Sequence, residues 1–251
     1  MLNRKDFRFE ICANGVESCI AAQDGGADRV ELCAGIPEGG TTPSYGEIKT
    51  ARKVLLSTRL HIIIRPRGGD FLYSKLELQR MVEDIDISKE LGADGVVFGC
   101  LKPDGSIDIE ACHILMEHTK GLNATFHRAF DRCKEPEKAL EQLVELGFTR
   151  VLTSGKMATA AEGVDLLKRL NQQADGRISI LAGCGINEKN IREIFEKTQI
   201  HEFHFSARTG MKSQMLYQNP QVYMGTKIVD EETLNYTSAE RVEKTIAALL
   251  K

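Results

Sequence analysis

The chain has 251 residues, a formal net charge of −3 at pH 7 and an isoelectric point near 6.1. It carries no long run of Lys or Arg, so nothing in its charge indicates a nucleic acid or an anionic membrane surface as a partner. The segment from Met1 to Glu10 is charged, and no stretch reaches the roughly 18 apolar residues of a membrane span. We therefore expect neither a secretory signal nor a transmembrane helix.

Seven cysteines are scattered along the chain, with no pair in a CxxC arrangement. An odd number in this pattern is typical of free thiols in a reducing compartment and argues against a disulfide framework. We therefore expect the protein in the cytoplasm.

Short apolar runs alternate with longer amphipathic segments from one end of the chain to the other. The runs predicted as strands are Phe7–Ala13, Asp28–Cys33, Arg59–Pro66, Asp94–Cys100, Asn123–Phe130, Arg150–Gly155, Arg177–Gly183 and His201–Ala207. The segments predicted as helices are Val16–Gly25, Tyr45–Ser57, Lys75–Leu91, Ile109–His118, Pro136–Leu146, Ala160–Gln173, Glu188–Lys197 and Ala239–Leu250. One helix follows each strand, which predicts an all-parallel sheet.

Eight such units in this length favour closure into a (β/α)8 TIM barrel that spans residues 1–251 as one domain. A doubly wound open sheet is the alternative, and it is less favoured because no Gly-rich dinucleotide fingerprint follows the first strand. The longest irregular stretch, 208–236, lies before the last helix. We expect it to be a long loop of the kind that often covers or binds ligands.

A short motif occurs twice, as Glu10-Ile11-Cys12 and Glu31-Leu32-Cys33, at the ends of the first two predicted strands. Residues i and i+2 of a strand share a face, so each motif puts a carboxylate and a thiol on one side. Neighbouring strands lie about 4.8 Å apart, which is roughly twice a zinc–thiolate bond of about 2.3 Å. The two cysteines could therefore hold a soft metal such as Cu(I), although a buried cysteine is more often a small core residue.

The other cysteines divide into two groups. Cys100 and Cys184 end predicted strands and could assist a metal site there. Cys19, Cys112 and Cys133 fall on helices or loops and are interpreted as structural.

In a barrel of this kind the chemistry lies at the carboxyl ends of the strands. Glu10, Glu31, Arg65 and Arg67 gather there and could be an ion-pair network or a site for an anionic ligand with a glutamate as base. His127 could be an acid–base group, a ligand or simply a hydrogen-bonded histidine. The candidate catalytic residues are Glu10, Glu31, Arg65 and His127.

The turn from Gly183 to Asn187 resembles an anion cradle, since glycines let the backbone approach a ligand and a helix follows. TIM barrels often bind phosphate near the seventh and eighth strands. The candidate anion-binding residues are Arg67, Thr153, Ser154, Gly183, Gly185, Ser206 and Arg208. Met211, Met215 and Met224 in the long loop could supply thioethers, although apolar packing is the favoured reading.

Several longer segments resemble the CutC family, which is named for copper homeostasis. The matching segments are Gly25-Gly26-Ala27-Asp28-Arg29-Val30-Glu31-Leu32-Cys33, Glu38-Gly39-Gly40-Thr41-Thr42-Pro43-Ser44, Ile64-Arg65-Pro66-Arg67-Gly68-Gly69-Asp70-Phe71, Gly95-Val96-Val97-Phe98-Gly99, Thr125-Phe126-His127-Arg128-Ala129-Phe130-Asp131, Arg150-Val151-Leu152-Thr153-Ser154-Gly155 and Ser206-Ala207-Arg208. The resemblance runs from about Phe9 to the last helix. One departure is Cys184, where the family usually has the middle glycine of a triplet.

The resemblance implies a cytoplasmic TIM barrel that forms oligomers, commonly dimers, and is linked to Cu(I) binding. Cys12 and Cys33 match the two positions that the family is thought to use for copper. The first hypothesis is therefore a Cu(I)-binding protein of copper homeostasis, with no organic cofactor. The alternative is an enzyme acting on a small phosphorylated or carboxylated metabolite, with Arg65, Arg67 and Arg208 as anion clamps and Glu10 or His127 as the base.

Overall fold

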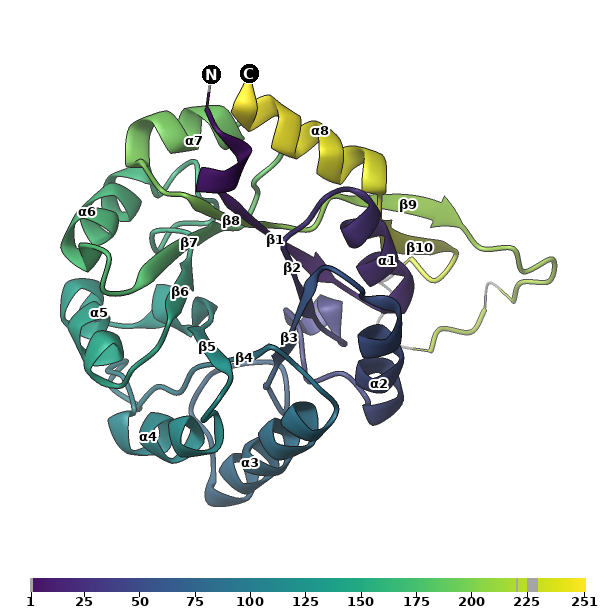
Figure 1. Ribbon diagram of the computed structural model, residues 1–251. Helices are drawn as coiled ribbons and strands as arrows, with labels where there is room; N and C mark the ends of the chain where they lie inside the picture. The colour runs from purple at the N-terminus through teal and green to yellow at the C-terminus, as the bar shows by residue number, and fades with distance from the viewer. Residues whose placement is uncertain (1, 220, 225–229) are drawn as a thin grey trace.

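Eight parallel strands close into a barrel in chain order, with β1 paired to both β2 and β8 (Figure 1). The computed structural model describes residues 2–219, 221–224 and 230–251. The barrel strands are β1 (Arg8–Ala13), β2 (Arg29–Leu32), β3 (Arg59–Ile63), β4 (Gly95–Phe98), β5 (Asn123–Phe126), β6 (Arg150–Thr153), β7 (Ser179–Gly183) and β8 (Glu202–Phe205). The predicted (β/α)8 barrel is confirmed, and the open sheet is excluded by the closure between β1 and β8.

Helices surround the barrel; seven of them follow a barrel strand, and the last follows a pair of further strands, β9 (Arg208–Lys212) and β10 (Thr233–Thr237) (Figure 1). They are α1 (Val16–Asp24), α2 (Tyr45–Val54), α3 (Lys75–Glu90), α4 (Ile109–His118), α5 (Pro136–Glu145), α6 (Val164–Ala174), α7 (Ile191–Thr198) and α8 (Ala239–Leu250). Outward strand residues such as Phe9, Val30 and Phe203 are fully buried in the core between strands and helices. Among the described residues, no helix has the length and apolar character needed to cross a membrane.

Short turns with left-handed glycines connect helices to the next strands. Gly26, Gly92 and Gly147 lie just after α1, α3 and α5 with φ of +86°, +84° and +83°. Glycine adopts this conformation without the steric cost of a Cβ atom. The repeated glycines that the sequence shows before strands therefore end the helices and turn the chain back into the barrel.

The segment 208–236 is not the irregular loop that was predicted. It contains two antiparallel strands, β9 (Arg208–Lys212) and β10 (Thr233–Thr237), which lie beside α1 at the rim of the barrel (Figure 1). Residues 220 and 225–229 of that prediction lie outside the described residues. The ribbon is fixed to the barrel because the Asn14 amide donates to the Asn235 carbonyl at 2.6 Å. We call this element the β9–β10 ribbon.

Candidate functional site

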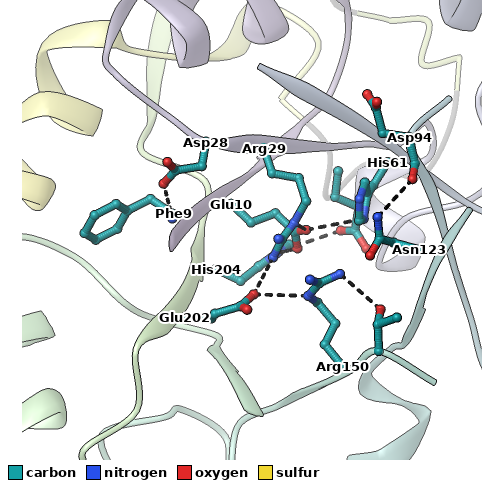
Figure 2. A network of polar contacts seen from close by, with 12 residues as sticks. Phe9, Glu10, Asp28, Arg29, His61, Asp94, Asn123, Arg150, Glu202 and His204 are labelled. Carbon is teal, nitrogen blue, oxygen red and sulfur yellow. Dashed lines mark hydrogen bonds and ion pairs between the residues drawn. The ribbon is translucent and has the colours of Figure 1, made fainter. Parts of the chain in front are cut away.

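A network of buried charges fills the barrel below its carboxyl-end opening (Figure 2). Arg29 forms ion pairs with Glu10 and, at 2.9 Å, with Glu202. Arg150 also donates to Glu202, at 3.0 Å. Burial alone would raise the pKa of Glu10, but Arg29 and His204 outweigh it and hold that pKa well below its usual value. Each charge in this interior network therefore has an opposite charge beside it.

His61 lies against the same network without a hydrogen bond to either ring nitrogen from the described residues. Its Nδ1 is 3.9 Å from a Glu10 oxygen. Burial, the largest cause, lowers the pKa of His61 to about 3. The ring is therefore neutral at physiological pH.

The two motif cysteines come together one layer above Glu10. Cys12 is opposite Glu31 in the β1–β2 register, and the Sγ atoms of Cys12 and Cys33 are 3.9 Å apart. Cys33 Sγ also lies 3.5 Å from Glu31 Oε2. The ligand atoms of Cys12, Glu31 and Cys33 all lie within 4.8 Å of one another. The prediction that the two thiols share one face and approach each other is confirmed.

Cationic side chains surround the sulfur of Cys12. Arg208 Nη2 donates to it at 3.2 Å. His204 is held by a 2.7 Å contact between its Nδ1 and Glu10, and its Nε2 is 3.7 Å from Glu31. A hydrogen bond from Cys33, aided by His204 and Arg208, lowers the pKa of the Cys12 thiol well below its usual value. The same hydrogen bond, together with burial, raises the pKa of Cys33.

Two neighbouring groups are shifted towards their protonated forms. Burial raises the pKa of Glu31 to about 8. Burial alone would lower the pKa of His204, but its hydrogen bonds with Cys12 and Glu10 raise it well above the usual value. These directions favour a thiolate at Cys12, a thiol at Cys33, a protonated carboxyl group at Glu31 and an imidazolium at His204.

These groups form one wall of a cavity of about 530 Å³ at the carboxyl end of the barrel. Of the predicted site residues, those that line the cavity are Cys12, Glu31, Cys33, Arg65, His127, Gly185, Ser206 and Arg208. Those that do not line it are Glu10, Arg67, Thr153, Ser154 and Gly183. The fold and the motifs thus predicted where the cavity lies, but five of the residues assigned to it lie elsewhere.

Each polar residue that does not line the cavity bonds to other groups of the protein. Glu10 belongs to the interior network, and Arg67 pairs with Glu77 at 2.6 Å and Asp70 at 3.0 Å on the outside. Thr153 donates its hydroxyl to the Asp131 carboxylate at 2.6 Å, and the Ser154 amide donates to the same group at 3.1 Å. Thr153 and Ser154 therefore bind an internal carboxylate where an external anion was expected.

Gly183 has a packing role. A Cβ atom at this position would lie 2.5 Å from a methyl carbon of Leu152. The glycine thus allows close contact inside the barrel and does not contribute to the cavity wall.

Arg65 and His127 line the cavity with part of their polar atoms already bonded to the backbone. Arg65 donates to the backbone carbonyls of Glu38, Gly40 and Gly69 at 2.7–2.9 Å, which braces the loops at the rim. His127 Nδ1 accepts from the Ala129 amide at 3.2 Å, so the ring proton lies on Nε2. Burial, and then Arg65, lower the pKa of His127 to about 3. His127 therefore offers a donor and not a base.

Two residues that line the cavity were missing from the predicted set. His204 contacts the thiol cluster, and Arg128 enters the cavity from the short helix that follows β5. His204 could have been found because it lies two residues before Ser206 and so shares its face. Arg128 is next to His127 in a quoted motif, but its direction depends on the turn after β5.

The two possible assisting cysteines lie apart from the thiol cluster. Cys100 is buried beside Cys112 and does not line the cavity. Cys184 does line it, but its sulfur contacts Arg128 and the Ala158 carbonyl. The exposed Met211, Met215 and Met224 on the β9–β10 ribbon and the chain beyond β9 do not line the cavity either.

The fold and the site together define a (β/α)8-barrel protein with a pair of neighbouring cysteines in its carboxyl-end cavity. The family model described as the CutC family matches residues 7–209, and the chain belongs to that family.

Relatives support this assignment along the whole chain. A CutC family protein of Bacteroides thetaiotaomicron is 62% identical over 246 residues, which cover 98% of this chain and 99% of the relative. The copper homeostasis protein cutC homolog of Homo sapiens is 47% identical over 246 residues, covering 98% of this chain and 89% of the human protein. The crystal structure of CutC from Streptococcus agalactiae is 38% identical, has a TM-score of 0.77, and covers 80% of this chain and 98% of its own.

Proposed function

We propose that the protein binds Cu(I) through Cys12 and Cys33 as part of copper homeostasis. The observation that carries the proposal is the 3.9 Å separation of the two sulfurs at the wall of an open cavity. This is less than twice a metal–thiolate bond of about 2.3 Å, so both sulfurs can bind one ion without moving apart. The human and streptococcal relatives are both named as copper homeostasis proteins, which supports the same function.

The donor set suits a soft ion. Thiolates prefer Cu(I) over hard cations such as Mg²⁺ or Ca²⁺. The hydrogen bond from Cys33, with His204 and Arg208, lowers the pKa of Cys12, so this ligand loses its proton more readily than an ordinary thiol. Cys33 has to lose its proton on binding, and the affinity should therefore rise with pH. Glu31 lies close enough to contribute an oxygen.

An anaerobic Cu(I) titration against a chromophoric competing chelator tests this function. We expect the double variant Cys12→Ser/Cys33→Ser to lose at least about a hundredfold in affinity, because both soft donors are gone. Cys184→Ser is the matched control, since its thiol lines the same cavity away from the pair. Equal affinities of the wild type and the double variant would exclude the proposal.

A second candidate function is favoured by the size and charge of the cavity. Its volume of about 530 Å³ exceeds what one ion needs, and Arg65, Arg128, Arg132 and Arg208 line it. These features support an enzyme acting on a small phosphorylated or carboxylated metabolite. Acid catalysis would fall to Glu31, whose carboxyl group is protonated at neutral pH because of burial.

Thermal shift measurements with a panel of phosphorylated and carboxylated metabolites test this second function. A specific anion should raise the melting temperature above that in NaCl of equal ionic strength. The absence of any such shift across the panel would remove this candidate and leave the copper proposal untouched.

We also propose that the protein is a cytoplasmic homo-oligomer, with a dimer favoured. The support is that all seven cysteines are free and that apolar side chains are exposed on and next to the β9–β10 ribbon, among them Met211, Met215 and Leu216. Light scattering after size-exclusion chromatography measures the oligomeric state directly. A monomer at micromolar concentration would contradict the proposal.

A further inference from the structure

Arg128 is a cation of the cavity that three contacts hold in a fixed position while part of its side chain stays exposed. Its Nε donates to Asp131 at 2.7 Å, Nη2 to the Ser154 hydroxyl at 3.0 Å and Nη1 to the Cys184 sulfur at 3.3 Å. Its side chain is still 42% exposed, and it lines the cavity. A guanidinium has five N–H groups, so one on each terminal nitrogen remains free for a ligand.

Asp131 orients Arg128 and has little capacity left for anything else. Its carboxylate accepts from the Thr153 hydroxyl, from the amides of Ser154 and Lys156, and from Arg128, all within 3.2 Å. Its side chain is only 7% exposed. The negative charge is thus spread over several donors in the wall, the Ser154 hydroxyl at 3.0 Å among them, which leaves Arg128 fixed but still able to donate into the cavity.

Backbone donors lie next to this guanidinium. Gly185 and Ile186 follow Cys184, whose sulfur Arg128 contacts, and both line the cavity. Within the described part of the chain their amides donate to no other backbone group. Gly185 has φ +75°, a conformation that glycine adopts without the steric cost of a Cβ atom.

The charge of the cavity makes an anion the matching ligand. Arg65, Arg128, Arg132 and Arg208 line it, against the carboxyl groups of Glu31 and Asp131. The interior network below shows the opposite situation, since Arg29 and Arg150 there are matched by Glu10 and Glu202 (Figure 2). The excess of cations is therefore confined to the layer that is open to solvent.

We propose that the wall made by Arg128 and the Gly185–Ile186 backbone is a subsite for the phosphate or carboxylate group of a small molecule. Arg128 binds the anionic group, and Asp131 is the residue that positions Arg128. The rest of the molecule extends across the cavity towards Cys12 and Glu31. This inference rests on the second proposed function for the existence of an anionic ligand, and it is independent of copper.

The test measures anion affinity by isothermal titration with inorganic phosphate and, separately, malonate, each against NaCl of equal ionic strength. Wild type is compared with Arg128→Met, Arg208→Met and Arg67→Met. Arg67 is the matched control, because it too is held by ion pairs, with Asp70 and Glu77, but lies outside the cavity. We expect a loss of at least tenfold for Arg128→Met and none for Arg67→Met. The anion that binds more tightly identifies the phosphate or carboxylate class.

The outcomes separate the two proposals. If Arg128→Met binds the anion as tightly as wild type while Arg208→Met does not, the subsite is wrong and the anion-binding function stands. If wild type binds neither anion, that function fails and the subsite fails with it.

A second measurement needs no variant. Phenylglyoxal modifies free guanidinium groups, and peptide mapping reports the rate at each arginine of the wild-type protein. Phosphate or malonate should slow the modification of Arg128 at least tenfold without slowing that of Arg67. Equal protection of both arginines, or of neither, would overturn the subsite.

Discussion

Two adjacent layers of the same barrel use the same kinds of residue for different ends. In the interior network, Glu10, Arg29, Arg150 and Glu202 are buried or nearly so and bonded to one another. In the cavity layer above, Cys12, His204 and Arg208 share one cluster, while further arginines face open space. The difference shows that a charged residue in a barrel indicates function only where its partners do not already use its bonding capacity.

The comparison also separates two energetic roles. A fully paired buried network adds little net stability over apolar packing, but it is costly to break because it leaves a lone buried charge. The cavity layer can lose a side chain more cheaply, since water replaces the missing partner. Substitutions should therefore separate the layers by their effect on the free energy of unfolding.

The largest effect is expected from removing a charge in the interior network. Arg29→Met leaves Glu10 buried and short of its main partner, so we expect a loss of about 3–5 kcal/mol in the free energy of unfolding, measured in urea. The control is Arg67→Met, which removes an exposed pair and should cost less than about 1 kcal/mol. Similar losses in both variants would contradict the distinction between the layers.

A smaller effect is expected on the pH dependence of stability. His61 has a pKa of about 3 in the fold, below its unfolded value. The unfolded chain therefore binds the proton more tightly, and stability falls as pH drops through the window from about 6.5 towards 3. At pH 5 this loss amounts to about 2 kcal/mol relative to pH 7. In urea unfolding at pH 7 and pH 5, His61→Gln should lose less stability between the two pH values than the wild type does.

Glu31 in the cavity layer should have the opposite sign. Its pKa of about 8 lies above the unfolded value, so its contribution to stability is present at low pH and is lost as pH rises towards 8. Glu31→Gln should flatten that part of the profile. If the two variants altered the pH profile in the same direction, the contrast between the layers would be wrong.

The reactivity of the thiols gives a third measurement. Cys12 is partly exposed and the pKa of its thiol is lowered, whereas the pKa of Cys33 is raised by its hydrogen bond to Cys12 and by burial. Iodoacetamide at pH 7 should therefore alkylate Cys12 first, as followed by peptide mapping. Arg208→Met removes a cation from the Cys12 sulfur and should slow this reaction about tenfold, which corresponds to about 1.4 kcal/mol. Faster alkylation of Cys33 than of Cys12 would refute the assignment.

The smallest effect concerns the backbone at the cavity wall. Cys184 has φ +77°, which is unfavourable for a residue with a Cβ atom. Cys184→Gly should stabilise the protein by about 1 kcal/mol in urea unfolding. Cys184→Ala removes the same thiol but keeps the strain, so it should not. Equal stability of the two variants would mean that the left-handed conformation carries no cost here.

The sequence predicts the barrel well because each strand is a short apolar run followed by an amphipathic helical segment, and glycines end three of the helices, α1, α3 and α5. The β9–β10 ribbon escaped prediction because it is a two-stranded, mostly exposed element that buries no apolar face. The approach of the two thiols was predictable, because the repeated Glu-x-Cys motif places both cysteines on the same face of neighbouring strands and at similar heights.

The sequence does not predict how far along the barrel axis a side chain lies, nor which polar group it bonds to. Glu10 shares the face of Cys12, as predicted, but two residues along a strand are about 6.6 Å, enough to move it from the cavity to the interior. Thr153 and Ser154 are polar strand-end residues of the expected kind, but they bind Asp131, which lies more than twenty residues earlier in the chain. Such pairings depend on the turn after β5, for which the pattern of apolar residues carries no information.

Arg208 connects the β9–β10 ribbon with the cysteine pair in the cavity. It is the first residue of β9, and it carries the guanidinium that contacts Cys12. The outward ribbon and the inward sulfur are therefore joined through a single residue. A contact that shifts the β9–β10 ribbon along its length would move the Arg208 guanidinium away from the Cys12 sulfur. Binding at the ribbon would therefore change the reactivity of Cys12.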